Sequence, residues 1–241
     1  MTLTRTLLSA ISLTAFPQLI AEAGEKRLFL DVAAVSALHD RGEQIGREVL
    51  EFGAGVEVDV GDAAVYGAFY RLLPVGSQQE AFDDEADFTV GVAWGGQGYS
   101  ADVSANWLTF PGEEADSSLE LAAAVTLDAP LAPSLIGFYD TDAEDWGLEV
   151  SAGPEWQAGL WTVYALGRAG FVHSGDGSAH RSYGGVEMGA LRPVSEFAAF
   201  GFFARADVAD EDAFARRIEG GEATAFRNSG VSAGISFSVS R

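Results

Sequence analysis

Residues 50–60 read LEFGAGVEVDV, and their side chains alternate between two chemical kinds. One set is apolar and comprises Leu50, Phe52, Ala54, Val56, Val58 and Val60; the other comprises Glu51, Gly53, Gly55, Glu57 and Asp59. A period of two is typical of a β-strand with one apolar and one polar face, whereas a helix repeats every three to four residues. Residues 50–60 therefore predict a strand that separates an apolar environment from a polar one.

The same alternation recurs along most of the chain, for example over residues 99–107, 119–128 and 231–239. The pattern predicts an all-β protein of about twelve strands, over residues 27–38, 48–60, 63–73, 87–94, 99–109, 118–128, 134–139, 146–156, 160–172, 182–191, 197–206 and 226–239. The phase of the third strand stays open. Arg71 points inward in one phase, whereas a two-residue turn at Gly61-Asp62 favours the opposite phase.

The connections between these strands alternate in length. The links after even-numbered strands are short, as at Gly61-Asp62, whereas those after odd-numbered strands are mostly longer and acidic, as at residues 74–86 and 207–225. An even number of short strands, with short turns at one end and long loops at the other, is typical of a bacterial outer-membrane barrel. A soluble sandwich has no reason to separate its loops by length. The predicted fold is a transmembrane antiparallel up-and-down β-barrel.

Aromatic residues lie at both ends of several apolar rows. The pairs are Tyr99 with Trp107, Trp146 with Trp156, and Trp161 with Phe171. Eight residue steps of about 3.3 Å, tilted by about 40°, give roughly 20 Å of height, which is near the apolar band of a membrane barrel. These rows are therefore predicted to face lipid.

The N-terminus has the features of a secretory signal peptide. Arg5 supplies a basic start, residues 7–20 are mostly apolar, and Ala21-Glu22-Ala23 matches a cleavage pattern. We expect residues 1–23 to be the signal peptide and residues 24–241 to form a barrel in the outer membrane of a Gram-negative bacterium. The alternative is an N-terminal helix packed on a core.

Composition excludes several classes of protein. The chain has 241 residues, is 48% hydrophobic, carries a formal net charge of −22 and has no cysteine. The apolar content argues against intrinsic disorder, and the negative charge argues against a nucleic-acid partner. The absence of cysteine excludes a disulfide framework and a thiolate metal site.

Two short stretches resemble a known family. Ala132-Pro133-Ser134-Leu135, followed by residues 138–142 (FYDTD), is similar to a stretch of the TorF-type porins, and Arg41-Gly42 resembles an early Arg-Gly pair of that family. The resemblance implies a porin of the outer membrane, with no assigned substrate and no catalytic residue. The expected partners are outer-membrane lipid, lipopolysaccharide, the barrel-insertion machinery and small solutes.

A lipid hydrolase is the enzymatic alternative, because some outer-membrane barrels use serine and histidine for catalysis. His39, His173 and His180 all fall in predicted loops, and the nearby Ser174 and Ser178 lie in a glycine-rich loop. No Gly-x-Ser-x-Gly sequence supports a nucleophile elbow. Loop solubility explains these residues better, so no catalytic residue and no cofactor is predicted.

Acidic runs in the long loops raise the question of metal binding. Residues 140–145 (DTDAED) place four carboxylates together, and oxygen ligands of this kind suit Ca²⁺. Asp145 stands where an EF-hand needs glycine, so a solvated loop is the favoured interpretation, as it is for residues 83–85 and 210–212. No protein metal site is predicted, although divalent ions could bridge such loops to lipopolysaccharide.

The polar faces of the strands predict the residues that line the lumen. These are Glu51, Glu57, Asp59, Asp102, Glu120, Asp128, Glu149, Glu155 and Glu187, with Arg71, Arg168 and Arg205. The arginines lie near long loops, where Glu51, Glu120 and Glu149 are available as partners. Asp59, Asp102 and Asp128 are predicted to lie deeper and to stay unpaired.

Two interpretations of this lumen compete. It is either a hydrated channel whose acidic wall attracts cations, or a structural barrel filled by arginine–carboxylate pairs and large side chains. Twelve strands lie between the filled eight-stranded barrels and the open sixteen-stranded porins. Small inward residues, namely Gly53, Gly55, Ala122, Ala124 and Gly153, favour a narrow pore for passive diffusion of small polar or cationic solutes, with mild cation selectivity.

Overall fold

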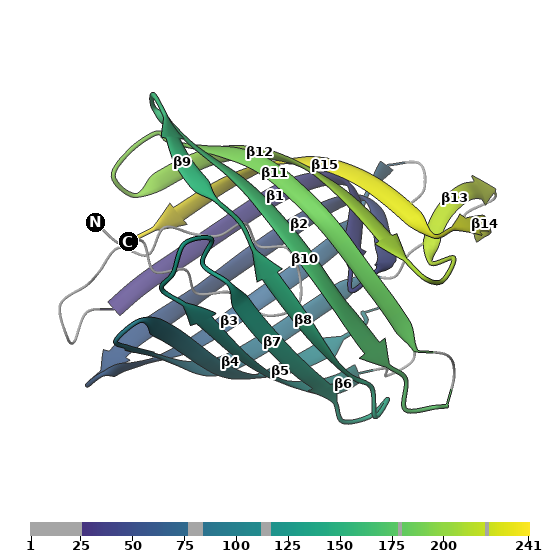
Figure 1. Cartoon of the computed structure of the whole chain (residues 1–241), viewed down its shortest axis with the longest axis horizontal. Coiled ribbons are helices and arrows are strands. Elements are labelled where there is room, and N and C mark those ends of the chain that lie inside the picture. Colours follow the sequence, from purple (N-terminus) through teal and green to yellow (C-terminus); the bar gives the residue numbers. More distant parts are fainter. Residues whose placement is uncertain (1–25, 77–83, 112–116, 178–179, 220–221) are drawn as a thin grey trace.

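A computed structural model shows the chain as a closed antiparallel β-barrel (Figure 1). The structure describes residues 26–76, 84–111, 117–177, 180–219 and 222–241. The expected signal peptide, residues 1–23, lies outside the described residues. No helix in the described ranges is long and apolar enough to cross a membrane.

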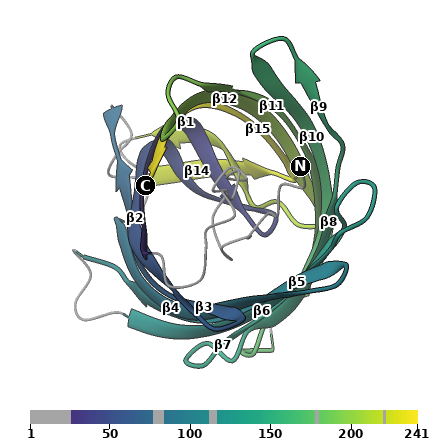
Figure 2. The same cartoon turned by 90° about the vertical axis from the view of Figure 1, so that its left-hand side faces the viewer.

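Twelve wall positions close the ring, which confirms the predicted fold class. Neighbouring wall strands pair antiparallel in chain order, except that residues 155–158 share one wall position with the strand before them and residues 214–227 form a separate hairpin. The first strand pairs with the last to complete the circle. Viewed along its axis, the barrel is a complete ring (Figure 2). The strands are β1 (Lys26–Asp40), β2 (Glu43–Val60), β3 (Ala63–Pro74), β4 (Glu85–Gly96), β5 (Tyr99–Thr109), β6 (Ser117–Leu127), β7 (Ser134–Asp140), β8 (Trp146–Ala152), β9 (Glu155–Ala158), β10 (Trp161–His173), β11 (Arg181–Pro193), β12 (Ala198–Ala209), β13 (Phe214–Glu219), β14 (Glu222–Arg227) and β15 (Ser229–Ser240).

The eighth predicted strand is divided in two. Both β8 and β9 pair with β10, so together they occupy one position of the wall. The break falls at Gly153-Pro154, where proline has no N–H to donate to a ladder. Because Gly153 lies at this break, its small size does not widen the lumen as we predicted.

The two faces of the wall differ as the alternation predicts. Val103 is 49% exposed and Val125 is 43% exposed on the outer face, whereas Asp102 is 4% exposed and Ala124 is 6% exposed on the inner face. The register places Asp102 opposite Ala124, and cross-strand partners share a face. The outer wall is therefore an apolar band suited to lipid.

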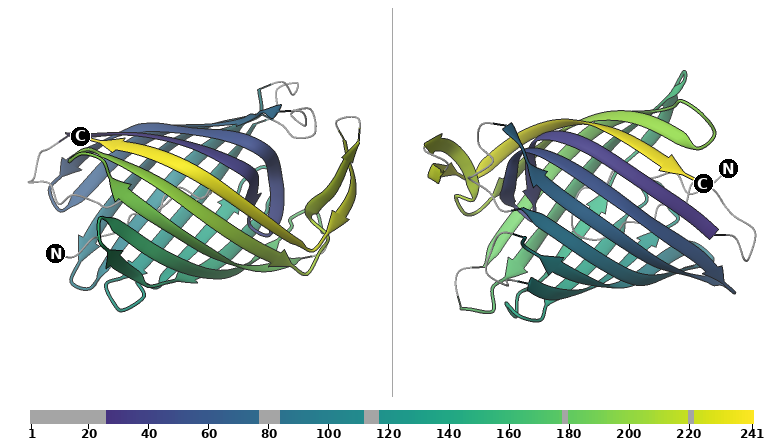
Figure 3. Two further views of the ribbon diagram at one scale, coloured as in Figure 1. Left: turned by 90° about the horizontal axis from the view of Figure 1, so that it is seen from above. Right: turned by 180° about the vertical axis from the view of Figure 1, so that it is seen from behind.

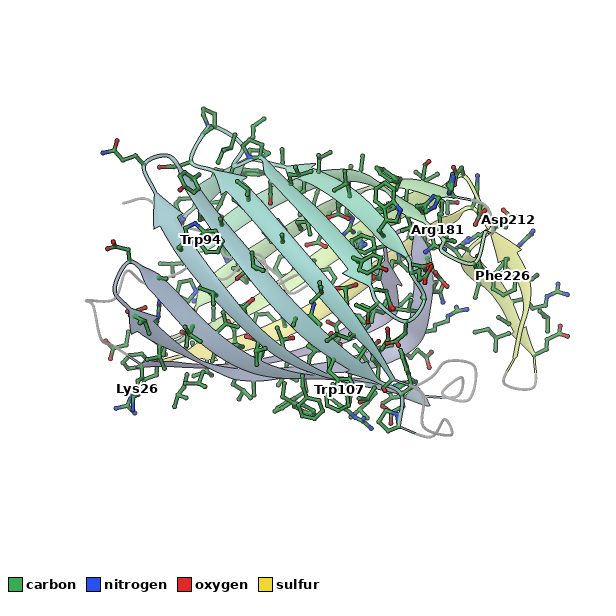
Figure 4. All side chains as sticks on the ribbon, turned by 90° about the horizontal axis from the view of Figure 1, so that it is seen from below. Lys26, Trp94, Trp107, Arg181, Asp212 and Phe226 are labelled. Carbon is green, nitrogen blue, oxygen red and sulfur yellow. The ribbon has the colours of Figure 1, made fainter. Side chains whose placement is uncertain are left out.

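Aromatic residues border this band at both ends. Tyr99, Trp107, Trp146 and Trp156 are all exposed on the outer face. Figure 4 shows Trp94 and Trp107 on the outer wall toward opposite ends of the barrel. The predicted aromatic borders are confirmed, and they mark the two boundaries of the lipid-facing belt.

Arginine at position 125 is expected to harm folding far more than arginine at position 124. Val125→Arg should lower the unfolding free energy by about 2–4 kcal/mol because it places a charge in the lipid-facing band. Ala124→Arg points into the lumen beside Asp102, so its loss should be much smaller. Urea titrations of the refolded variants in lipid vesicles measure the difference. Equal losses would contradict the assignment of the two faces.

The phase of the third strand is the one favoured by the Gly61-Asp62 turn. Arg71 pairs in register with the outward Phe52, and its guanidinium forms an ion pair with Asp84. The prediction that Arg71 lines the lumen is therefore wrong. Tyr66 and Tyr70 occupy the inner face instead, where both are buried.

Two hairpins occupy regions that were predicted to be loops. β1 and β2 extend through residues 39–47 and are joined by a turn at Arg41-Gly42, whose φ angles are 44° and 79°. A register shift at Leu38/His39 and a positive φ of 55° at Glu48 accompany the bend of these two strands. As a result the tip of the hairpin turns into the barrel (Figure 3). The second hairpin, β13–β14, lies beyond the end of the wall (Figure 1).

We call the end of the barrel that carries the Gly61-Asp62 turn the short-turn end, and the opposite end the long-loop end. Residues 37–48, which fold into the long-loop end, are called the inner hairpin.

Candidate functional site

Tyrosine hydroxyls hold several of the lumen carboxylates in place. Each tyrosine lies on a strand different from that of the carboxylate it binds. The described pairs are Tyr70 to Glu51 at 2.7 Å, Tyr164 to Glu187 at 2.8 Å, Tyr66 to Asp102 at 3.0 Å and Tyr183 to Glu149 at 3.0 Å. The structure places these carboxylates on the inner face of the wall, and their tyrosine partners were not predicted.

Inward glycines receive aromatic rings from neighbouring strands. A Cβ atom at Gly91 would lie 2.3 Å from Cζ of Tyr66, and one at Gly189 would lie 2.5 Å from Cζ of Tyr164. The ring of Phe29 covers Gly55 in the same way. Such glycines allow a ring to lie against the wall instead of projecting across the lumen. The prediction that Gly55 leaves open space is therefore wrong for that position.

A small ion-pair cluster lies toward the short-turn end. Arg27 bonds to Glu57 and lies 3.0 Å from Oδ1 of Asp59. Asp59 was predicted to be unpaired, and this partner contradicts that prediction. Asp128 is exposed in the turn after β6, and Glu155 is exposed on β9, so neither is a buried wall residue.

A second cluster is centred on Asp207 near the long-loop end. Its carboxylate lies 2.7 Å from Nε of Arg205, 3.1 Å from Nη2 of Arg168 and 2.9 Å from Nδ1 of His39. Arg168 and Arg205 point inward as predicted. Asp207 and His39 were placed in loops by the sequence analysis, and that placement is wrong because both lie in strands and are buried.

The inner hairpin crosses the lumen and bonds to the opposite wall. Nη1 of Arg41 donates to Oε2 of Glu120 over 2.5 Å, and its guanidinium lies 3.5 Å from the centre of the Phe138 ring. Glu120 belongs to β6 and Phe138 to β7, which lie across the ring from β1 and β2 in the strand order. Figure 2 shows the hairpin inside the ring.

Contacts from further strands fix the tip of this hairpin. Nε of Arg181 donates to the carbonyl oxygen of Arg41 over 3.0 Å, and Arg181 also pairs with Glu43 at 2.9 Å. The N–H of Gln44 donates to the carbonyl oxygen of Ala213 just before β13. A Cβ atom at position 42 would lie 2.4 Å from Cβ of Tyr183, so the turn requires Gly42 for close packing as well as for its φ.

The charge of Arg41 is strongly favoured at this position. Burial lowers the pKa of the guanidinium, but the carboxylates of Asp40 and Glu120 raise it by more, and the net pKa is above its ordinary value. Arg41 is thus a permanent cation that compensates the buried carboxylate of Glu120.

Other inward carboxylates keep oxygens without a protein hydrogen-bond partner. Among the described residues, neither oxygen of Asp31 has such a partner, and the same holds for Oδ1 of Asp87 and Oδ2 of Asp102. Asp31 and Asp87 were absent from the predicted set. Asp31 alternates with Leu30 and Val32 in the sequence, so the same period of two marks it as an inward residue.

The acidic loop at residues 140–145 stabilises its own turn. Oδ1 of Asp140 accepts hydrogen bonds from the N–H groups of Asp142 and Ala143, both over 2.9 Å. Oδ1 of Asp145 accepts one from the N–H of Gly175 over 2.8 Å. Within the described ranges, no group of three or more His, Cys, Asp or Glu side chains has the geometry of a metal site.

The His39–Asp207 contact resembles a base and its orienting carboxylate. A nucleophile would have to lie within hydrogen-bond reach of the second ring nitrogen. In the described part of the chain, Nε2 of His39 has no such partner, and the ring packs edge-on against Phe214 with their centres 5.0 Å apart. The geometry is that of an anchor for the inner hairpin.

The comparisons with known proteins found a similarity of fold but no sequence match. No protein-family model and no curated protein matches the chain. The barrel is similar to an outer-membrane channel from Pseudomonas putida F1, with a TM-score of 0.51 and 8% identity over 92% of this chain and 97% of that chain. It is also similar to a structure from work on in-meso crystallization of membrane proteins, with a TM-score of 0.50 and 9% identity over 89% and 83% of the two chains. The chain thus shares the closed-barrel fold of an outer-membrane channel.

Proposed function

We propose that this barrel is a porin-like channel of the outer membrane, of the TorF type that its sequence resembles, for passive diffusion of small polar or cationic solutes. The observation that carries the proposal is the excess of carboxylates on the inner wall. The acidic residues are Asp31, Glu51, Glu57, Asp59, Glu85, Asp87, Asp102, Glu120, Glu149, Glu187 and Asp207, against Arg27, Arg41, Arg168, Arg181 and Arg205. Buried carboxylates in such excess are favourable when water or mobile cations share their space.

The inner hairpin supplies the constriction of this channel. It crosses the lumen at the long-loop end and narrows a barrel that is already of intermediate size. Solutes have to pass beside Arg41 and the carboxylates around it. The constriction therefore excludes large solutes and admits small hydrated ones.

The proposed cellular location and the route of assembly rest on the sequence. The signal peptide is removed near Gly24, the barrel-insertion machinery places the chain in the outer membrane, and lipopolysaccharide surrounds its long loops. The proposal gives the lumen the role of a passage, and among the described residues Nε2 of His39 has no hydrogen-bond partner.

Planar-bilayer recordings of the refolded protein test the proposal. We expect discrete single-channel steps and a reversal potential in a KCl gradient that shows cation preference. The preference should weaken at high salt, because charges are screened beyond about 3 Å at 1 M ionic strength. Anion selectivity would contradict the role given to the acidic wall.

The second candidate is a structural barrel with a filled lumen. It is favoured by the tight packing near the long-loop end, where Phe214 is fully buried and His39 and Glu120 are each 1% exposed. A folded barrel that gives no current, either as wild type or after release of the inner hairpin, would support this candidate over a channel.

A further inference from the structure

Three basic side chains project from the outer wall at the short-turn end. They are Arg192 at the end of β11, Arg241 directly after β15 and Lys26 at the start of β1. Arg192 is the register partner of the outward Phe200, and Arg241 exchanges backbone hydrogen bonds with the outward Leu28. Lys26 lies two residues before Leu28 on β1 and therefore shares its face. All three side chains are exposed, so they point to the surroundings of the barrel and not into its lumen.

These residues belong to neighbouring positions of the wall. The ring order is β11, β12, β15 and β1, so the three side chains lie within one sector of the barrel. Adjacent strands are about 4.8 Å apart, which places the backbones of Arg192 and Arg241 about 10 Å from each other across β12. Figure 4 shows Lys26 on the rim of the wall at the same end as Trp94. We call Lys26, Arg192 and Arg241 the basic sector.

Aromatic rings support the two arginines. The guanidinium carbon of Arg192 lies 5.8 Å from the centre of the Trp161 ring, and that of Arg241 lies 5.7 Å from the centre of the Phe197 ring. The Trp161 ring in turn packs against Phe202, with their centres 5.4 Å apart. Contacts of this length hold a cation beside a ring. Because aromatic residues mark the boundary of the lipid-facing belt, these guanidinium groups lie at the level of lipid headgroups.

The protein supplies no counter-charge for the basic sector. Among the described residues, no carboxylate forms an ion pair with any of its three side chains. Glu196, in the adjacent β11–β12 turn, is exposed and takes no part in such a pair. Arg71 also faces outward, but it pairs with Asp84 near the long-loop end. In a chain with a net charge of −22, the basic sector is thus a positive surface that attracts an external anion.

We propose that the basic sector binds the phosphate group of an anionic phospholipid of the phosphatidylglycerol class. Guanidinium groups match phosphate oxygens with paired, charge-assisted hydrogen bonds, and lysine adds a flexible point charge. In outer-membrane barrels the short turns face the periplasm, so the sector meets the phospholipid leaflet and not lipopolysaccharide. The inference rests on the proposed outer-membrane location, but it does not require the lumen to conduct.

Fluorescence quenching by brominated lipids tests the proposal. The protein is refolded in phosphatidylcholine vesicles that contain phosphatidylglycerol, with bromine on the acyl chains of one lipid at a time. We expect stronger quenching by brominated phosphatidylglycerol than by the same fraction of brominated phosphatidylcholine. Trp161 lies beside Arg192, so Trp161→Phe should remove this excess, whereas Trp107→Phe, at the opposite end of the barrel, should retain it.

Removing the two guanidinium groups should weaken the preference for the anionic lipid. In Arg192→Gln/Arg241→Gln, the binding constant of phosphatidylglycerol relative to phosphatidylcholine should fall at least about fivefold, since one basic residue near a lipid surface changes binding by about that factor. Arg192→Lys/Arg241→Lys keeps the charges and should keep most of the preference. Arg216→Gln/Arg217→Gln is the matched control, because it removes two exposed arginines from β13, beyond the wall, and should leave the preference unchanged.

An unchanged preference in the folded glutamine variant of the basic sector would overturn the proposal and leave the channel standing. Loss of the preference in the control would show a general charge effect, and loss in the lysine variant would show that charge is not its basis; either result would overturn the proposal. Tighter binding of lipid A through the same two arginines would reassign the sector to lipopolysaccharide, and a cross-linked dimer that the glutamine variant loses would reassign it to a second copy.

Two further results separate this inference from the proposed function. A barrel that gives no current but keeps the preference would overturn the channel alone. A barrel that does not insert into vesicles would overturn the membrane location, on which the channel and the basic sector both depend.

Discussion

Arg41→Ala is expected to raise single-channel conductance several-fold and to lower the unfolding free energy by about 3–5 kcal/mol. The guanidinium is the link between the inner hairpin and the opposite wall, through Glu120 and the Phe138 ring. Its removal breaks this link across the lumen and leaves a buried carboxylate without its cation. Bilayer recordings and urea titrations in vesicles measure the two effects.

The double variant Arg41→Ala/Glu120→Gln separates the two effects. Removing the orphaned charge should restore most of the lost stability, and the amide oxygen of glutamine can still accept the hydrogen bond that Asn106 now donates to Glu120. The conductance should stay high, because the link across the lumen is still absent. A double variant with wild-type conductance would show that the hairpin is held by its other contacts and does not set the constriction through Arg41.

Asp207→Ala is expected to be the most damaging change in the cluster at the long-loop end. The change would leave Arg168, Arg205 and His39 near one another without the carboxylate that they share. The Asp207 side chain is only 2% exposed. Removing one partner of a buried ion pair typically lowers stability by about 3–5 kcal/mol. Chemical unfolding of the refolded barrel in vesicles provides the measurement.

Asp62→Asn is the matched control, because Asp62 is an exposed carboxylate in the Gly61-Asp62 turn. Exposed substitutions away from special features usually change stability by less than about 0.5 kcal/mol. If Asp207→Ala were as mild as this control, the buried cluster would not anchor the inner hairpin.

The wall of the barrel was predictable from the sequence because each strand separates lipid from a polar interior. This difference imposes a period of two on residues 50–60, 99–107 and 119–127, and the structure keeps that phase throughout. The short turns and long loops also fall at opposite ends as predicted. The alternation in the sequence was sufficient to predict those strands whose two faces meet different environments.

The third strand and the inner hairpin show where local pattern is insufficient. In residues 63–73 both faces carry aromatic or small residues, so burial of Tyr66 and outward placement of Arg71 depend on tertiary partners. Residues 39–47 are too polar to suggest a strand, because their environment is the charged lumen. The partner of Arg41 is 79 residues away and that of His39 is 168 residues away, and no spacing rule connects them.

The inner hairpin has a consequence for the order of assembly. It is formed by the first two strands, yet it bonds to residues of β6, β7, β11 and β12, so its contacts have a very large separation along the chain. Contacts of this kind form late in folding, because the entropy of loop closure must be overcome first. We therefore expect the inner hairpin to dock late, once the strands that it contacts are in place, and its docking then narrows the lumen.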